Sequence, residues 1–328
     1  MIGIDVLEPG LQTTVQDRGR PGHARFGVSA AGAADPLALD LGNRLVGNPP
    51  EAAAVEMTLL GGSFRFEAPA VVALAGADMG AEADGLPFPP FASRRIRAGA
   101  IVRCGAAAKG ARCYLAVAGG IDTPPWLGSR STHLPSRLGG LEGRALRRGD
   151  RLPIGALPAA DPGVSSAAGG PPPMILRDRE LLAPSRTIRV TAGAHAPRFD
   201  AETLRLFETA EFTVSATSDR MGLRLDGATL PARGSGRMPS EGMPLGAIQV
   251  PPDGAPILLF VDHQTTGGYP VIAAVIAADL WRVGQLRPGA RLRFEPVTME
   301  TARALQLAQR QRLRSPDLLA ADSAGPGA

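Results

Sequence analysis

Two stretches decide the fold, Arg148-Gly149-Asp150-Arg151-Leu152-Pro153-Ile154 and Pro288-Gly289-Ala290-Arg291-Leu292-Arg293-Phe294. Each is a glycine turn followed by a short segment typical of a closing β-strand. Asp17-Arg18-Gly19 similarly echoes Asp219-Arg220-Met221-Gly222. Helical patterns do not alternate regularly with strand patterns along the chain. The echoes therefore predict a mainly β protein with a few helices, built as two related β-barrel domains and not as an α/β sheet.

The chain divides by composition into two halves. Residues 1–155 are expected to form an N-terminal β domain, and residues 186–313 a C-terminal β domain with a terminal helix. Between them, residues 156–185 are rich in Ala, Pro, Gly and Ser, which predicts a linker or a long surface excursion. The tail, 314–328, is rich in Ala, Asp, Ser and Gly and is expected to be disordered.

Capping residues mark the expected helices. Asp35 precedes Pro36 and a leucine stripe, so a helix is expected to begin there with its stripe facing the core. The stripe consists of Leu37, Leu41 and Leu45. The other expected helices follow Asp200, lie near 275–283 and run from Thr298 to about residue 313. Strands in the second half are expected at 187–191, 211–216, 246–250, 257–261 and 291–294.

Composition bounds the function class. The chain has 328 residues, 44% of them hydrophobic, which gives room for two domains of ordinary size. Its net charge is +4, but the arginines are scattered, aromatic residues make up only 4%, and no basic run occurs. Nucleic acid is therefore not an expected partner. No apolar run is long enough to span a bilayer, and residues 1–9 do not read as a signal peptide. We expect no membrane association and a cytoplasmic location.

The rarer residue types limit the cofactors. Lys109 is the one lysine, and its Ala-Lys-Gly context fits neither a phosphate-binding loop, a Schiff base nor a biotin attachment site. No covalent biotin is therefore expected on this chain. The four histidines are scattered, so no metal site is expected. The spacing of Cys104 and Cys113 fits neither a redox pair nor a zinc site, and two buried thiols on adjacent strands are expected.

Two polar clusters lie in the first half. In Thr13-Thr14-Val15-Gln16-Asp17-Arg18-Gly19-Arg20, Asp17 sits among donors, and Arg20 offers a guanidinium that could bind carboxylate or phosphate. A structural Asp–Arg clamp is the alternative. In Gly128-Ser129-Arg130-Ser131-Thr132-His133, the hydroxyl of Ser131 and its neighbours could cradle an anion together with backbone amides. A serine-rich turn is the alternative there.

A third cluster joins residues 218–224 with residues 240–242 in the second half. Arg220, Arg224 and Glu241 could orient an amide or carboxylate substrate, although surface ion pairs would explain them as well.

The fourth cluster is Asp262-His263-Gln264-Thr265-Thr266-Gly267-Gly268-Tyr269-Pro270, directly after an apolar strand-like segment. It concentrates carboxylate, imidazole, amide and hydroxyl groups, and its glycines allow a close ligand approach or a positive φ. A polar turn is the alternative. If the flanking strands pair as a hairpin, Gln249 comes near Gln264. Common hydrolase and dinucleotide-binding motifs do not occur in a fitting context.

These clusters, in this order, resemble the 5-oxoprolinase C-subunit family, also called KipA or allophanate hydrolase subunit 2, which is related to the carboxyltransferase region of urea carboxylase. The similarity covers roughly residues 3–296. The resemblance implies two cyclophilin-like β-barrel domains. It also implies, as partner, a KipI-like B subunit, possibly with a LamB/YcsF-like A subunit, and ATP used at the level of the complex.

Three functions follow from this resemblance. The first is a subunit of an ATP-dependent hydrolase that opens 5-oxoproline to glutamate. The second is a carboxyltransferase that moves a carboxyl group from carboxybiotin, held on a separate carrier, to urea or a related amide. The chain lacks biotin-carboxylase and biotin-carrier regions, which weakens that alternative. The third is a non-catalytic regulatory subunit that binds a KipI-like partner.

The two enzymatic functions imply roles for the polar residues. Both reactions act at an amide or urea group and develop negative charge on oxygen, so preorganised donors are expected. Asp262 or Glu241 is expected to orient or deprotonate the nucleophile with help from His263, and Arg220 or Arg224 to hold the substrate carboxylate. The expected donors are Gln249, Gln264, Thr265, Thr266, Gly267, Gly268 and Tyr269. Asp17, Arg20 and Ser131 are further substrate-binding candidates.

Overall fold

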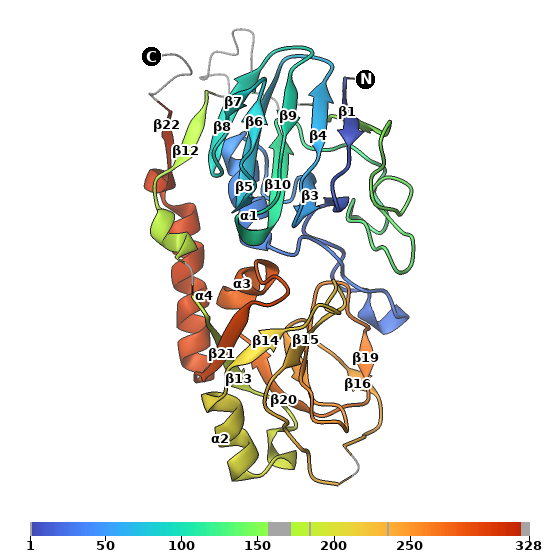
Figure 1. The fold of residues 1–328 in the computed structure, drawn as a ribbon, viewed down its shortest axis with the longest axis vertical. Helices are drawn as coiled ribbons and strands as arrows, with labels where there is room; N and C mark the ends of the chain where they lie inside the picture. Colours follow the sequence, from blue (N-terminus) through green and yellow to red (C-terminus); the bar gives the residue numbers. More distant parts are fainter. Residues whose placement is uncertain (1, 157–171, 184, 235, 323–328) are drawn as a thin grey trace. The chain divides into compact units, whose positions relative to one another are not determined.

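The computed structural model describes residues 2–156, 172–183, 185–234 and 236–322. Within this part the protein is mainly β-sheet with four α-helices, as predicted (Figure 1). The chain forms two compact units. Unit 1 comprises Met1–Arg20, Asp35–Glu180 and Ser315–Ala328, and unit 2 comprises Pro21–Ala34 and Leu181–Arg314. Both units are therefore assembled from segments that are distant in the sequence.

Unit 1 contains two antiparallel sheets. The six-stranded sheet has the order β11 (Arg151–Pro153), β1 (Gly3–Glu8), β4 (Ser63–Phe66), β9 (Ile101–Arg103), β6 (Glu82–Ala83) and β7 (Leu86–Pro87). The seven-stranded sheet has the order β2 (Gln12–Gln16), β3 (Ala54–Thr58), β10 (Lys109–Val117), β5 (Ala70–Asp78), β8 (Ala92–Ile96), β12 (Met174–Leu176) and β22 (Leu319–Ala321). The first stretch quoted above thus contains an edge strand, β11, which pairs with β1.

The two sheets share one hydrophobic core. Ile4 and Val6 lie on either side of Asp5 in β1, and both of their side chains are buried. On the outer face of the same sheet Arg65 of β4 pairs with Asp5 at 2.8 Å. The core is completed from the other sheet by Val55, Met57, Val72, Leu74, Leu115 and Val117. Alternation with period two therefore builds the core, as expected for half-buried strands.

Helix α1 (Pro36–Leu45) packs on β5 and β10 of unit 1. Asp35 caps it, because Asp35 Oδ1 accepts a hydrogen bond from the backbone N–H of Ala38 at 2.8 Å. At Gly42 the helix lies so close to the sheet that an added Cβ would stand 3.3 Å from Ala75 Cβ. The predicted leucine stripe is buried. The capping prediction for this helix is confirmed.

Unit 2 contains a closed barrel. Its strands follow the order β13 (Thr187–Ala192), β20 (Val271–Val275), β17 (Ala247–Gln249), β18 (Ile257–Leu259), β15 (Gly222–Asp226), β14 (Phe212–Val214) and β21 (Arg291–Pro296). β21, which belongs to the second quoted stretch, closes the barrel by pairing in parallel with β13 and antiparallel with β14. A short ladder outside the barrel joins β16 (Glu241–Gly242) and β19 (Thr266–Gly267).

Three helices belong to unit 2. α2 (Ala201–Thr209) is capped by Asp200 and buries Phe207, whose ring stacks on Phe294 of β21 at a centroid distance of 4.7 Å. α3 (Leu280–Gly284) is shorter than the helix expected near residues 275–283, because β20 continues to Val275. α4 is Met299–Arg314, with Thr298 at its start as predicted. The short 3₁₀ helices of the chain are η1 (Ala24–Phe26), η2 (Arg179–Leu182), η3 (Ala196–Arg198), η4 (Ala277–Asp279) and η5 (Pro316–Leu318).

The structure corrects the linear division of the chain. The described part of the expected linker forms β12, and the expected tail forms η5 and β22, which pairs with β12. The apolar side chains of Leu176 and Leu318 are buried, and in the tail this burial overrides a composition that favours disorder. Residues 157–171, 184 and 323–328 lie outside the described residues, so the predictions made for them stay predictions.

The cysteines are free and buried, as predicted, but not on adjacent strands. Cys104 follows β9 of the six-stranded sheet, whereas Cys113 lies on β10 of the seven-stranded sheet. Burial raises the pKa of Cys104 to about 12 and also raises the pKa of Cys113. Both thiols therefore stay protonated near neutral pH and pack as apolar groups in the hydrophobic core of unit 1.

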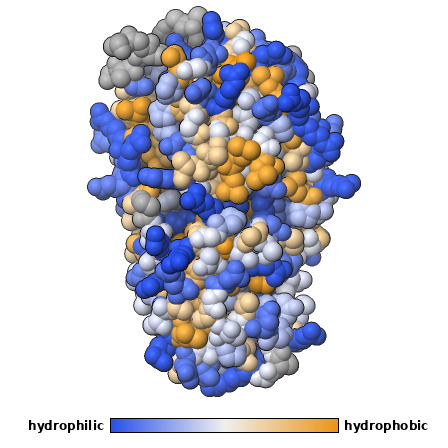
Figure 2. Space-filling view, in the orientation of Figure 1, coloured by the Kyte–Doolittle hydropathy of each residue, from blue (hydrophilic) through white to orange (hydrophobic). Residues whose placement is uncertain are grey.

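Hydrophilic residues cover most of the face seen in Figure 2, with hydrophobic residues in separate groups between them. The most exposed large hydrophobic side chains are those of Leu11, Phe26 and Met299, at 65, 67 and 68%. In the described part of the chain no helix combines the length and apolar character needed to cross a bilayer.

Candidate functional site

The two polar clusters of unit 1 meet around one buried carboxylate. Asp17 Oδ1 accepts hydrogen bonds from the hydroxyls of Ser129 and Ser131 at 2.6 and 2.5 Å, and Oδ2 accepts one from the N–H of Arg130 at 2.5 Å. The predicted anion cradle is therefore filled by the protein's own carboxylate.

Arg20 closes the same network. Its guanidinium is 2% exposed, lies 5.3 Å from the centroid of the Trp126 ring and donates through Nη2 to the Ser131 carbonyl. Ser131 thus connects Asp17 and Arg20 below the surface, because its hydroxyl donates to Asp17 and its carbonyl accepts from Arg20. These contacts favour a structural role over the substrate-binding role expected for the three residues.

The third and fourth clusters meet in unit 2. β16 and β19 pair antiparallel, which sets Glu241 opposite Gly267 and Gly242 opposite Thr266 (Figure 1). The N–H of Met243 also donates to the carbonyl of Thr265 at 2.9 Å. The loop from Asp262 to Pro270, called the polar loop below, is therefore fixed along one edge by the segment that carries Glu241.

Gln249 and Gln264 come together as the hairpin argument predicts. β17 pairs with β18, and Gln264 Nε2 lies 3.4 Å from Gln249 Oε1. Gln249 is 2% exposed, and its own Nε2 contacts Met243 Sδ at 3.2 Å and the Tyr269 carbonyl at 3.4 Å. The two contacts to oxygen, at 3.4 Å, are long for hydrogen bonds, so the Gln249 amide is only weakly bound to the polar loop.

The two loop glycines serve close packing. Neither has a positive φ, so of the two possibilities that the glycines offered, left-handed backbone is the one that the loop does not use. A Cβ at Gly267 would stand 2.5 Å from Gln249 Nε2, and one at Gly268 would stand 3.0 Å from the Met238 carbonyl oxygen. Gly267 therefore makes room for the Gln249 amide.

Asp262 is bound by Arg220. Arg220 Nε and Nη2 donate to the two carboxylate oxygens of Asp262 at 2.8 and 3.1 Å, and both residues are at most 5% exposed. Arg220 Nη2 also donates to the carbonyl of Gly32 at 2.7 Å. This buried pair anchors the start of the polar loop and the 21–34 segment. The geometry fits neither a base role for Asp262 nor a substrate-carboxylate role for Arg220.

His263 is buried beside that clamp. Its Nδ1 lies 2.7 Å from the carbonyl oxygen of Gln264, so Nδ1 carries the proton and donates. Burial lowers the pKa of His263, and the Gln264 carbonyl and the Asp262 carboxylate raise it by smaller amounts. The neutral ring is therefore favoured, with its lone pair on Nε2, which is the form that can accept a proton.

The remaining predicted residues occupy different surroundings. Arg224 is exposed on β15 between the buried Leu223 and Leu225, so it lies on the outer face of the barrel. Tyr269 is half-buried. The side chain of Glu241 is 52% exposed. Among the carboxylates expected in the site, Glu241 is the one that solvent and substrate can reach.

Sequence reasoning missed His195. Its Nε2 lies 3.3 Å from Glu241 Oε2, and its Nδ1 accepts a hydrogen bond from the N–H of Val271 at 3.1 Å. Val271 directly follows the polar loop, yet it is 76 positions from His195 in the sequence. The one local signal was a histidine placed shortly after the glycine that follows β13.

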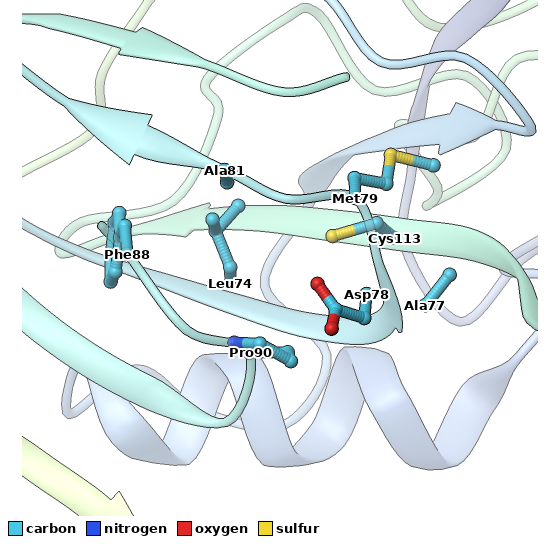
Figure 3. A pocket seen from close by; sticks show the side chains of 8 residues that line it. All are labelled: Leu74, Ala77, Asp78, Met79, Ala81, Phe88, Pro90 and Cys113. Carbon is cyan, nitrogen blue, oxygen red and sulfur yellow. The ribbon is translucent and has the colours of Figure 1, made fainter. Parts of the chain in front are cut away.

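A small apolar pocket lies elsewhere, in unit 1 (Figure 3). It is too small to hold a water molecule and is lined by Leu74, Ala77, Asp78, Met79, Ala81, Phe88, Pro90 and Cys113. None of the predicted site residues lines it. Because the polar groups gather in unit 2 and the pocket offers a single carboxylate, we place the candidate site at the polar loop. Within the described residues, no group of three or more His, Cys, Asp or Glu could hold a metal ion.

Comparisons with known proteins agree across nearly the whole chain. The family described as carboxyltransferase domain, subdomain A and B, matches residues 26–296. The chain is 39% identical over 299 residues to the 5-oxoprolinase C subunit of Escherichia coli, covering 91% of this chain and 93% of that protein. It is 37% identical over 303 residues to the 5-oxoprolinase C subunit of Haemophilus influenzae, covering 92 and 94%. The K. lactis urea amidolyase structure matches with a TM-score of 0.84 and 30% identity, over 99% of this chain and 21% of that one.

Proposed function

This chain belongs to the carboxyltransferase domain family, subdomains A and B, and we propose that it is the C-type subunit of a 5-oxoprolinase complex. The observation that carries the proposal is the extent of the match. The two 5-oxoprolinase relatives are covered over 93 and 94% of their own length, so the likeness extends to the whole of each protein.

The reaction proposed is the ATP-dependent opening of 5-oxoproline to glutamate. Water adds its oxygen to the lactam carbonyl carbon, the ring C–N bond breaks, and the ring nitrogen takes a proton. Negative charge develops on the carbonyl oxygen, and the amides of Gln249 and Gln264 are donors suited to it. Glu241 is the carboxylate proposed to orient or deprotonate the nucleophile, since Asp262 is bound by Arg220. His263, with its lone pair on Nε2, assists.

Partner proteins follow from the names of these relatives, because a protein named as one subunit is part of a larger assembly. As partners we propose a KipI-like B subunit together with a LamB/YcsF-like A subunit, with ATP used by the complex, in the cytoplasm.

The test is glutamate release from 5-oxoproline by the chain co-purified with its candidate KipI-like and LamB/YcsF-like partners, with and without ATP. Gln264→Ala and Tyr269→Phe are expected to lower kcat at least about 100-fold without unfolding the protein, because they remove groups of the polar loop. Gln311→Ala, on the exposed face of α4, is the matched control and should leave kcat unchanged. Near-normal activity of both loop variants would contradict the placement of the site.

A second function has one specific observation in its favour, the urea amidolyase match over 99% of this chain. In that case the chain would transfer a carboxyl group from carboxybiotin, presented by a separate carrier, to urea or a related amide. This activity would be inhibited by avidin, whereas lactam hydrolysis would not. A regulatory role, the third alternative, would require binding to the KipI-like partner and would leave turnover unchanged in the polar-loop variants.

A further inference from the structure

His195 is tied to the end of the polar loop by two reciprocal hydrogen bonds. The N–H of His195 donates to the Val271 carbonyl at 3.1 Å, and the N–H of Val271 donates to His195 Nδ1 at 3.1 Å. Gly193 lets the chain approach so closely, because a Cβ there would stand 2.3 Å from the Val271 carbonyl oxygen. The imidazole is therefore held in one orientation by the backbone.

This arrangement fixes the tautomer of His195. A nitrogen that accepts a backbone N–H carries no proton, so Nδ1 holds the lone pair and the neutral ring carries its proton on Nε2. That Nε2–H group faces Glu241 Oε2 across 3.3 Å. His263 shows the opposite tautomer, since its Nδ1 donates to a carbonyl. The two histidines of the site are thus distinguishable.

Glu241 is held from two sides. The β16–β19 ladder fixes its backbone opposite Gly267, and His195 faces its carboxylate. We infer that His195 is a positioning residue, which orients the Glu241 carboxylate toward the polar loop through its Nε2–H group. The catalytic part of this inference rests on the proposed function, in which Glu241 handles the nucleophile. The orientation of the carboxylate does not depend on the identity of the substrate.

The first test uses the isolated chain and no substrate. Long-range ¹H–¹⁵N spectra of protein labelled with ¹⁵N-histidine should show His195 with its proton on Nε2, and His263 with its proton on Nδ1 as internal reference. Glu241→Gln should shift the Nε2 resonance of His195 and leave His263 unchanged. A proton on Nδ1 of His195, or an Nε2 resonance that does not respond to Glu241→Gln, overturns the inference.

The second test separates the two contacts of His195 in the co-purified complex. His195→Asn retains an acceptor for the Val271 N–H but does not reach Glu241, whereas His195→Gln carries an amide N–H at the reach of Nε2. We expect His195→Asn to lower kcat about 10- to 100-fold, as loss of a hydrogen bond to a charged group does, with KM nearly unchanged. His195→Gln should restore most of kcat. His23→Asn, at a histidine outside the site, is the matched control.

A double-mutant cycle completes the test. In a Glu241→Gln background, His195→Asn should have little further effect on kcat, because the two side chains act as one unit. Independent losses, or His195→Asn and His195→Gln of equal kcat, overturn the inference even if the enzyme hydrolyses 5-oxoproline. The expected tautomer and resonance shift in a complex without 5-oxoproline turnover would instead contradict the proposed function and support the orientation of Glu241 by His195.

Discussion

Gly267 contributes to the candidate site because the absence of a side chain leaves space for the Gln249 amide. The position where a Cβ would stand is 2.5 Å from Gln249 Nε2, closer than any real contact of this kind. Gln249 is buried, so its amide has little room to move aside. The absence of a side chain at Gly267 of β19 therefore determines where the Gln249 amide, which we place against the substrate oxygen, can lie.

Gly267→Ala should accordingly affect catalysis more than folding. The added methyl group displaces the Gln249 amide, and we expect kcat to fall about 100-fold, as a shift of about 1 Å in a catalytic group does. The free energy of unfolding should fall by about 1–3 kcal/mol, typical of an overpacked position. Turnover and urea denaturation measure the two effects. Gly242→Ala on the paired strand, where a Cβ meets nothing within 4 Å, is the control and should be nearly neutral.

At the scale of elements, the Arg220–Asp262 pair connects three segments of unit 2. It joins the loop before β15 to the start of the polar loop, and through the Gly32 carbonyl it also holds the 21–34 segment. A further contact, from the Ser29 hydroxyl to the Val261 carbonyl at 3.4 Å, attaches the same segment. A buried ion pair thus fixes the start of the polar loop, and this pair takes no part in the chemistry proposed.

Asp262→Asn tests the contribution of that pair. The change removes the negative charge to which the buried Arg220 guanidinium donates two hydrogen bonds, so the free energy of unfolding should fall by about 3–5 kcal/mol. Glu211→Gln is the matched control, because Glu211 pairs with Arg291 at 3.2 Å on the surface. An exposed pair of that kind contributes at most about 1 kcal/mol. Urea denaturation of both variants measures the difference in their free energies of unfolding. Equal losses of stability would show that the buried Arg220–Asp262 pair does not stabilise the polar loop.

The elements themselves were largely predictable. Asp35 with Pro36 marked α1, and the glycine turn before Arg291 marked the strand that closes the barrel, because these signals act within a few residues. Long-range pairs were not. Ser131 lies 114 positions from Asp17 and His195 lies 76 positions from Val271, so no spacing in the sequence showed that the first pair fills an anion cradle or that the second orients a ring.

At the scale of the whole molecule, neither unit is a continuous stretch of chain. Unit 1 includes β22, formed by residues 319–321, and unit 2 includes residues 21–34. The composition predicted a disordered tail after residue 313, because composition reflects residue types alone. It contains no information about a strand elsewhere in the chain with which those residues could pair. β12 is that strand.

Removal of residues 315–328 should therefore destabilise unit 1. The truncation uncovers β12 and loses the burial of Leu318, which contributes about 1.5–3 kcal/mol. Hydrogen exchange followed by mass spectrometry should show lower protection of the amides in β12, with little change in the barrel strands of unit 2. Truncation after Asp322, which keeps β22, is the control. Unchanged protection of β12 in the longer truncation would contradict a structural role for β22.

The pairing of β12 with β22 also sets an order of events during translation. Every residue of unit 2 has been synthesised once Arg314 has been added, although unit 2 begins only at Pro21. Unit 1 begins at the N-terminus, yet its last described strand is added only when Ala321 is made. β12 is made well before β22, so this edge of β12 stays without its partner strand until Ala321 has been added and has left the ribosome.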